Sequence, residues 1–130
     1  MKPRDRAAFT DLPPAAVARV EKATDAVAAI RKLTGNALSL TVTCDAPVCA
    51  ELTSQPDRRL VHLVNYDSQK PVVNVAVLVQ VPKGRKPKVV LLADPEQSQD
   101  TEVPFEQDND NVRFVVPKLS VYAVAAIQLQ

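Results

Sequence analysis

The sequence predicts a mainly β fold, an immunoglobulin-like antiparallel β-sandwich of about seven to eight strands preceded by one N-terminal α-helix. Short valine-rich segments recur from residue 38 onward, and turn residues separate them at short intervals. The chain has 11 prolines but only 2 glycines, so Pro, Asp, Asn and Ser must make most turns. Its 130 residues suffice for one domain with a hydrophobic core, and the 46% apolar content is typical of a folded protein.

The N-terminal region, residues 1–35, is expected to hold a charged tail and a helix from Pro13 to about Leu33. Asp11 can accept hydrogen bonds from the first turn, and Gly35 can end the last turn in a left-handed conformation. The apolar residues of this helix fall on one stripe at helical spacing: Val17, Val20, Val27 and Ile30. We expect residues 1–35 to act as a linker or packing helix, and residues 36–130 to form the β-sandwich domain.

Two valine-rich runs, Leu60–Tyr66 and Val72–Val81, are the strongest strand signals, and a short polar break separates them. This pattern predicts a β-hairpin of two core strands. Leu38–Thr43 alternates apolar and polar residues, as a half-buried strand does. The remaining strands are expected at Val48–Thr53, Lys88–Ala93, Glu102–Glu106, Val112–Val116 and Val121–Leu129.

Composition excludes several classes of partner. The formal net charge of +1 gives no long-range electrostatic attraction to nucleic acid or to an anionic membrane. No apolar run is long enough for a transmembrane helix. The basic residues at 83–88 have no interleaved aromatics, so we interpret them as a solvated loop. Two glycines cannot build a phosphate-binding loop. No cofactor is therefore expected.

Cys44 and Cys49 flank a segment where the chain is expected to reverse. Across a tight turn their Cα atoms could approach within the roughly 4.4–6.8 Å that a disulfide needs. The alternative is a pair of small, part-buried thiols. A disulfide would favour an extracellular or periplasmic location, because such bonds persist in oxidising compartments. A zinc site is not expected, because no further Cys or His pair completes four ligands.

No pattern in the chain indicates a catalytic site. His62 is the single histidine and lies within an apolar run, so we interpret it as a hydrogen-bonded strand residue. The acidic segment Glu106–Asn111 lacks the glycine and the distal glutamate of a calcium loop and predicts a solvated hairpin turn. The expected site therefore contains neither catalytic nor metal-binding residues.

Three ordered motifs carry a resemblance to a known family. They are the strand Val61–Tyr66, the loop Val81–Gly84 and the closing segment Val116–Ile127. Together they resemble the C-terminal accessory β-sandwich of multidomain glycoside hydrolases, of the β-galactosidase-like and putative glycosyl hydrolase type. The resemblance implies a non-catalytic domain beside a carbohydrate-active enzyme. The family's catalytic acids belong to its barrel domain, and no residue of this chain matches them.

The expected function is therefore that of a structural accessory domain that packs against other domains of a glycoside hydrolase and does not hydrolyse sugars alone. One alternative is a carbohydrate-binding module, for which Tyr66, Phe105 and Tyr122 are the candidate sugar-stacking residues. Trp is absent and aromatic residues are scarce, which favours the structural role. The other alternative is an immunoglobulin-like module that binds proteins through an exposed apolar sheet face.

Overall fold

The computed structural model describes residues 22, 25–33, 38–67 and 69–130. The chain divides into two units, with the boundary between Leu38 and Ser39. The two units are described separately below.

The N-terminal unit contains helix α2, Ala26–Leu33, within the predicted helical segment. Arg31 and Lys32 lie in its last turn, where positive charge is favourable beside the carbonyl end of the helix. Val27 is 63% exposed and Leu33 is 46% exposed. The predicted start near Asp11 and the terminating glycine lie outside the described residues. The role of this helix as a linker or packing element stays a prediction.

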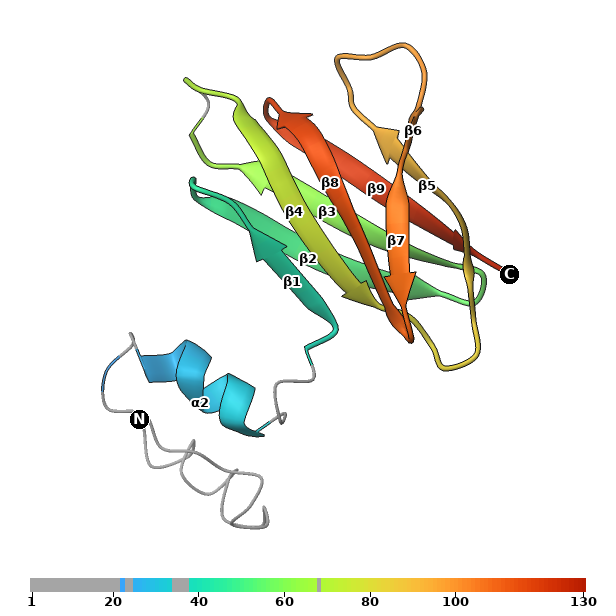
Figure 1. The fold of residues 1–130 in the computed structure, drawn as a ribbon. Coiled ribbons are helices and arrows are strands. Elements are labelled where there is room, and N and C mark those ends of the chain that lie inside the picture. The colour runs from blue at the N-terminus through green and yellow to red at the C-terminus, as the bar shows by residue number, and fades with distance from the viewer. Residues whose placement is uncertain (1–21, 23–24, 34–37, 68) are drawn as a thin grey trace, which may run out of the picture. The chain divides into compact units, whose positions relative to one another are not determined.

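The second unit confirms the predicted mainly β, two-sheet architecture (Figure 1). A four-stranded sheet has the order β1-β4-β8-β7, and a five-stranded sheet has the order β2-β3-β9-β5-β6. All pairs are antiparallel. The strands are β1 (Leu40–Thr43), β2 (Val48–Gln55), β3 (Arg58–Asn65), β4 (Val72–Gln80), β5 (Pro87–Ala93), β6 (Thr101–Val103), β7 (Phe105–Asp108), β8 (Asn111–Leu119) and β9 (Tyr122–Leu129).

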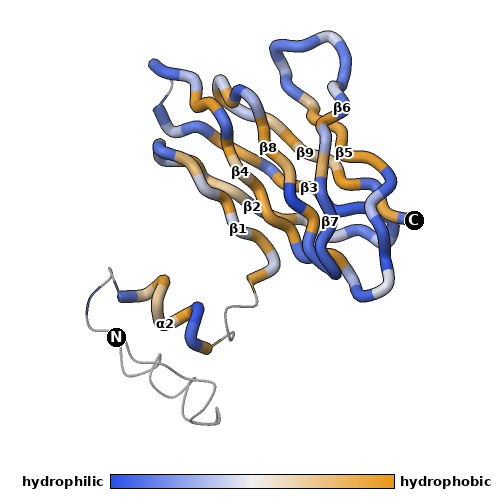
Figure 2. Tube along the Cα trace, viewed as in Figure 1, coloured by the Kyte–Doolittle hydropathy of each residue, from blue (hydrophilic) through white to orange (hydrophobic). Residues whose placement is uncertain are grey.

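Alternation along the strands places one apolar set between the two sheets. Val61 and Leu63 on β3, and Val75 and Val77 on β4, are at most 1% exposed. Figure 2 shows hydrophobic residues concentrated along the strands and hydrophilic residues along the loops. Burial of these side chains, each worth about 1.5–3 kcal/mol relative to exposure, is the main force holding the sheets together.

The predicted hairpin of two core strands is wrong. Strand β3 belongs to the five-stranded sheet and pairs with β2 and β9, whereas β4 belongs to the four-stranded sheet and pairs with β1 and β8. The segment between them crosses from one sheet to the other. Two alternating strands joined by a short break can face each other across a core as well as pair side by side, and periodicity does not distinguish the two arrangements.

A second crossing links β1 to β2, also in different sheets, and a third links β8 to β9. Asn65 forms hydrogen bonds with two of these crossings, and it is the one buried polar residue among those described. Its side-chain Nδ2 donates to the Lys70 carbonyl at 2.7 Å and to the Ser120 carbonyl at 2.9 Å. Its Oδ1 accepts from the backbone N–H of Asp67 at 2.9 Å.

Backbone bonds complete this junction. The N–H of Asn65 donates to the Val121 carbonyl at 2.8 Å, and the N–H of Tyr66 donates to the Pro47 carbonyl at 3.2 Å. The turn after β3 is therefore hydrogen-bonded both to the β8–β9 corner and to the β1–β2 crossing. Buried polar groups with full hydrogen bonding fix a chain path more specifically than apolar contacts do.

The segment Glu102–Glu106, predicted as one strand, is two strands in different sheets. It divides at Pro104, with β6 pairing to β5 and β7 pairing to β8. Proline has no N–H to donate and a fixed φ, so it interrupts ladder pairing at this point. This division accounts for a ninth strand where seven to eight are predicted.

Replacement of Asn65 by alanine is expected to lower the free energy of unfolding by about 2–3 kcal/mol, because it removes the three part-buried hydrogen bonds that the side chain makes. Urea denaturation followed by circular dichroism measures the change. Asn111→Ala is the matched control, since Asn111 is exposed at the start of β8. The control is expected to change stability by no more than about 0.5 kcal/mol. Equal effects of the two substitutions would show that the junction does not stabilise the fold.

Candidate functional site

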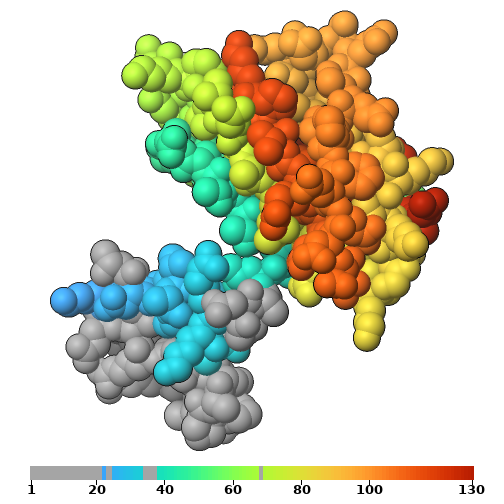
Figure 3. All heavy atoms as spheres, in the orientation of Figure 1, coloured from blue at the N-terminus to red at the C-terminus, as the bar shows by residue number. Residues whose placement is uncertain are grey.

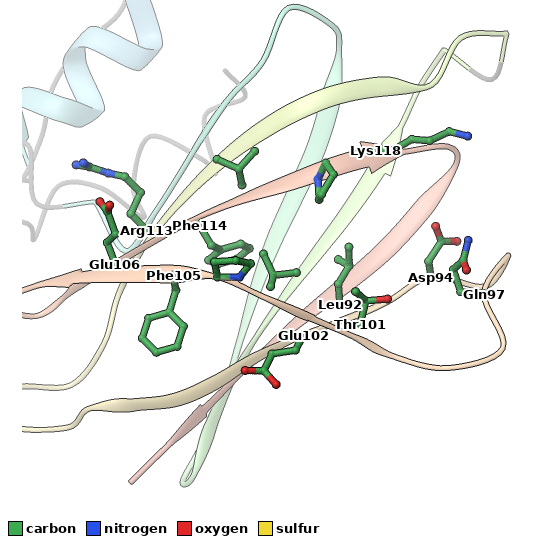
Figure 4. A pocket seen from close by; sticks show the side chains of 14 residues that line it. Leu92, Asp94, Gln97, Thr101, Glu102, Phe105, Glu106, Arg113, Phe114 and Lys118 are labelled. Atoms are coloured by element: carbon green, nitrogen blue, oxygen red, sulfur yellow. The ribbon is translucent and has the colours of Figure 1, made fainter.

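A cleft of about 790 Å³ lies where the chain switches between sheets (Figure 4). Its apolar lining includes Leu92 on β5, Val103 on β6 and Phe114 on β8, all of which belong to the core. Pro104, Val115 and Pro117 also contribute apolar surface. Strand β7 pairs with β8 only from Asp108 back to Phe105, which lies opposite Phe114. Before Phe105 the chain belongs to β6 in the other sheet, and the cleft lies where the chain changes sheets.

Polar side chains from the β5–β6 loop surround one end of the cleft. Figure 4 shows Asp94, Gln97 and Thr101 grouped at this end, with Leu92 beside them. Asp94 shapes the loop, because its Oδ1 accepts from the N–H of Glu96 at 2.9 Å and its carbonyl accepts from the N–H of Gln97 at 2.9 Å. This side-chain-stabilised turn presents the Gln97 side chain at the surface.

The other end of the cleft carries charges of both signs. Glu106 on β7 and Arg113 on β8 are cross-strand partners and lie side by side in Figure 4. Opposite charges in such a pair stabilise strand pairing modestly. Phe105 and Glu102 project from the other side of the β6–β7 segment. The cleft thus combines an apolar floor with a mixed polar rim.

A second, shallower hollow of about 370 Å³ lies on the outer face of the five-stranded sheet. Its lining includes Cys49, Glu51, His62 and Tyr122. His62 Nδ1 lies 2.9 Å from the hydroxyl of Tyr122, and the two rings stack with centroids 6.4 Å apart. Glu51 is the cross-strand partner of His62. The imidazole is thus held by a phenol on the neighbouring strand.

The thiol in this hollow is not paired with the imidazole. A nucleophile–base pair of this kind needs the thiol within hydrogen-bond reach of the imidazole. Within the described part of the chain, Cys49 makes no hydrogen bond to His62. The hydrogen bond between His62 and the Tyr122 hydroxyl orients the two side chains.

Cys44 and Cys49 are free thiols in this structure, and the disulfide between them stays a prediction. Cys44 is half-buried and packs against the core, and its Sγ donates to the Ala46 carbonyl at 3.2 Å. Cys49 is exposed and lines the outer hollow. Because β1 and β2 belong to different sheets, the chain between the cysteines is a crossing rather than the tight hairpin turn that would bring the thiols together.

The three candidate stacking residues do not form one site. Phe105 lines the cleft, Tyr122 lines the outer hollow, and Tyr66 lines neither. Tyr66 is 72% exposed and follows β3, while Tyr122 is 37% exposed at the start of β9. Their role in glycan binding stays a prediction.

The acidic segment is the hairpin turn between β7 and β8. Asp108 pairs with Asn111, and Asn109 between them has φ of 54°, a left-handed conformation that asparagine adopts more readily than most residues. Among the residues that the structure describes, no three His, Cys, Asp or Glu side chains gather as metal ligands. Within the same residues, no helix has the length and apolar character needed to cross a membrane.

The basic residues lie in the connection from β4 to β5 and at the start of β5. Lys83, Lys86 and Lys88 are exposed. The backbone here is fixed by two reciprocal hydrogen bonds between Lys86 and Gln130, and Gly84 takes φ of +81° in the turn. The basic cluster is thus spread along a solvated turn and a strand end.

No model of a protein family matches the chain, and no curated protein sequence matches it either. Solved structures do match. The chain is similar to an α-L-fucosidase isoenzyme 2 from Paenibacillus thiaminolyticus, with 26% sequence identity and a TM-score of 0.68 over 81% of this chain. The predicted resemblance to part of a glycoside hydrolase is confirmed. The matched region is 17% of the fucosidase chain, so this chain spans less than a fifth of that protein.

A second similar structure is a cycloisomaltooligosaccharide glucanotransferase from Paenibacillus sp., complexed with cycloisomaltoheptaose. Its TM-score is 0.57 at 17% identity, over 75% of this chain and 19% of that chain. At this identity the likeness concerns the fold alone. In both comparisons a small β-sandwich matches a small part of a much longer protein.

The residues that build the cleft were not singled out from the sequence, apart from Phe105 and Glu106. They come from β5, the following loop, β6 and β8, which meet only because the chain changes sheets at Pro104. The one local signal is this proline inside a short strand pattern, since proline is excluded from the interior of a continuous central strand.

Exposure predicts different reactivity for the two thiols. In the native chain, Ellman's reagent is expected to modify Cys49 rapidly and the core-packed Cys44 only slowly, because the thiolate must be accessible to react. Cys49→Ser is expected to remove the fast phase, and Cys44→Ser is expected to leave it intact. A chain with no reactive thiol before and after denaturation would instead show that the disulfide forms.

Proposed function

We propose that this chain is a non-catalytic, structural accessory domain that packs against neighbouring domains of a carbohydrate-active enzyme. The observation that carries this proposal is the outer face of the five-stranded sheet. In a sandwich the side chains pointing away from the core are ordinarily polar. Here the outward positions of three adjacent strands are mainly apolar, which is typical of a protein interaction surface.

We call these outward side chains on β3, β9 and β5 the apolar outer band. They alternate with buried core residues and are half-buried. The register aligns Leu60 with Ala126 and Ala126 with Leu91 in one apolar row across the three strands, whereas His62 lies opposite Val124 in the neighbouring row. The band consists of Leu60, Val64, Val89, Leu91, Ala93, Val124 and Ala126.

The opposite outer face is more polar. On the four-stranded sheet, whose outer side faces the viewer in Figure 3, the outward row includes Thr41, Leu78, Arg113 and Glu106. Charged side chains are depleted in the centres of protein interfaces because their desolvation is costly. The five-stranded sheet is thus the better docking face.

Similarity to small parts of longer carbohydrate-active enzymes supports the same proposal, since such a part has other domains available as partners. Other domains of a parent chain are therefore the proposed partners. A glycosidase centre needs two carboxylates on opposite sides of a bound sugar, about 5–9.5 Å apart. The proposal assigns no hydrolytic role to any residue of this chain.

The proposal predicts that the purified chain unfolds cooperatively and does not hydrolyse aryl glycosides. A panel of 4-nitrophenyl fucosides, glucosides and galactosides tests this by release of nitrophenol. Glu102→Gln and Glu106→Gln variants serve as controls against a contaminating hydrolase. Hydrolysis by the wild-type chain that either variant abolishes would overturn the non-catalytic assignment.

The apolar outer band is expected to make the isolated chain self-associate as its concentration rises, because apolar surface of this kind favours contact with a second copy. Leu91→Lys, at the centre of the band, is expected to abolish this association in sedimentation velocity experiments. Leu78→Lys is the matched control, since Leu78 is also half-buried but points outward from the four-stranded sheet. Loss of association in the control but not in Leu91→Lys would assign docking to the other face.

A further inference from the structure

The cleft at the sheet switch is not used by the packing role proposed above. We propose that it is a binding subsite for a neutral oligosaccharide, held between the β5–β6 loop and β8. The proposal is independent of the apolar outer band, which lies on a different surface. It rests on the floor of the cleft, the chemistry of its rim, the balance of its charges and the two prolines in its walls.

The floor of the cleft is apolar and fixed by the core. Leu92, Val103 and Phe114 are each at most 8% exposed, so their positions are set by packing rather than by a ligand. Sites for small ligands usually have volumes of roughly 300–1,000 Å³ and a mainly apolar, preformed lining. A cleft of about 790 Å³ lies within this range. The C–H face of a pyranose ring is suited to such a floor.

The rim supplies hydrogen-bonding groups that match sugar hydroxyls. A hydroxyl both donates and accepts, and Asp94, Gln97 and Thr101 offer a carboxylate acceptor, an amide and a hydroxyl at one end of the cleft. The turn within the loop already uses Asp94 Oδ1, which leaves the second carboxylate oxygen for a ligand. Because the loop is already ordered, ligand binding loses less conformational entropy.

The charges around the cleft favour a neutral ligand. Its lining contains three carboxylates and two cations, which are Asp94, Glu102, Glu106, Arg113 and Lys118. The near balance gives no net attraction for a polyanion or a polycation. Uncharged hydroxyl groups, by contrast, can bond to members of both sets.

The walls disfavour a peptide as the occupant. An extended peptide that adds to a sheet edge needs alternating backbone N–H and C=O groups on that edge. Pro104 and Pro117 lie on the two facing segments and have no N–H to donate. Most rim residues are also Asp, Glu, Lys and Thr, and acidic residues and lysine are depleted in protein interfaces. An oligosaccharide fits these conditions because it binds through side chains alone.

The test is a titration of the ¹⁵N-labelled full chain with maltohexaose, cellohexaose, xylohexaose and mannohexaose, followed by amide chemical shifts. A heparin hexasaccharide is the anionic comparison ligand. At least one neutral sugar is expected to shift the amides of the β5–β6 loop and of Val115 in a saturable manner. The heparin hexasaccharide is expected to leave them unchanged.

Gln97→Ala and Thr101→Val are each expected to weaken this binding about fivefold, the effect of one lost hydrogen bond. Gln99→Ala is the matched control for the loop, since Gln99 is exposed there but does not line the cleft. The proposal is overturned if no neutral sugar shifts the cleft residues, if heparin binds them more tightly, or if Gln97→Ala and Gln99→Ala have equal effects. Shifts confined to Tyr66 or Tyr122 would also overturn it.

Discussion

The hydrogen bonds of Asn65 are the constraint on which the sandwich depends. Three connections cross between the sheets at one end of the molecule, and the side chain or the backbone around Asn65 reaches each of them. Apolar burial drives the two sheets together, but it does not determine which strand follows which across the core. The buried amide adds part of this information, because its donors and acceptor are satisfied only when the β3–β4 and β8–β9 connections lie in place.

Strand positions could be predicted from the sequence because alternation and valine content are local properties. The sequence could not predict which sheet each strand joins. Inward residues such as Leu63 on β3 and Val75 on β4 can pack into the core from either sheet. The sequence alone shows that Asn65 is a polar residue on the inward face of a strand. Its structural role depends on hydrogen bonds to the carbonyls of Lys70 and Ser120, and Ser120 is 55 positions away in the chain.

The cleft was harder to foresee than the fold. Its residues are individually ordinary: a turn aspartate, an exposed glutamine, a strand threonine and several core apolar residues. They become a site only through the crossing at Pro104, which opens a gap between β6 and β8. The apolar outer band, in contrast, could be predicted in part from the sequence. Leu60 and Val64 are apolar residues on the outward face of β3, whose inward face is also apolar. No aromatic stripe or acidic motif marked either surface.

The switch at Pro104 also bears on aggregation. An open sandwich has two edges on each side, and unpaired edge strands can recruit strands from other molecules. On one side here, a single segment supplies both edge strands, β6 and β7, each of at most four residues. Two short edges separated by a proline offer a poor template for intermolecular pairing. The same residue that opens the cleft therefore limits edge-to-edge strand pairing at this side of a valine-rich sandwich.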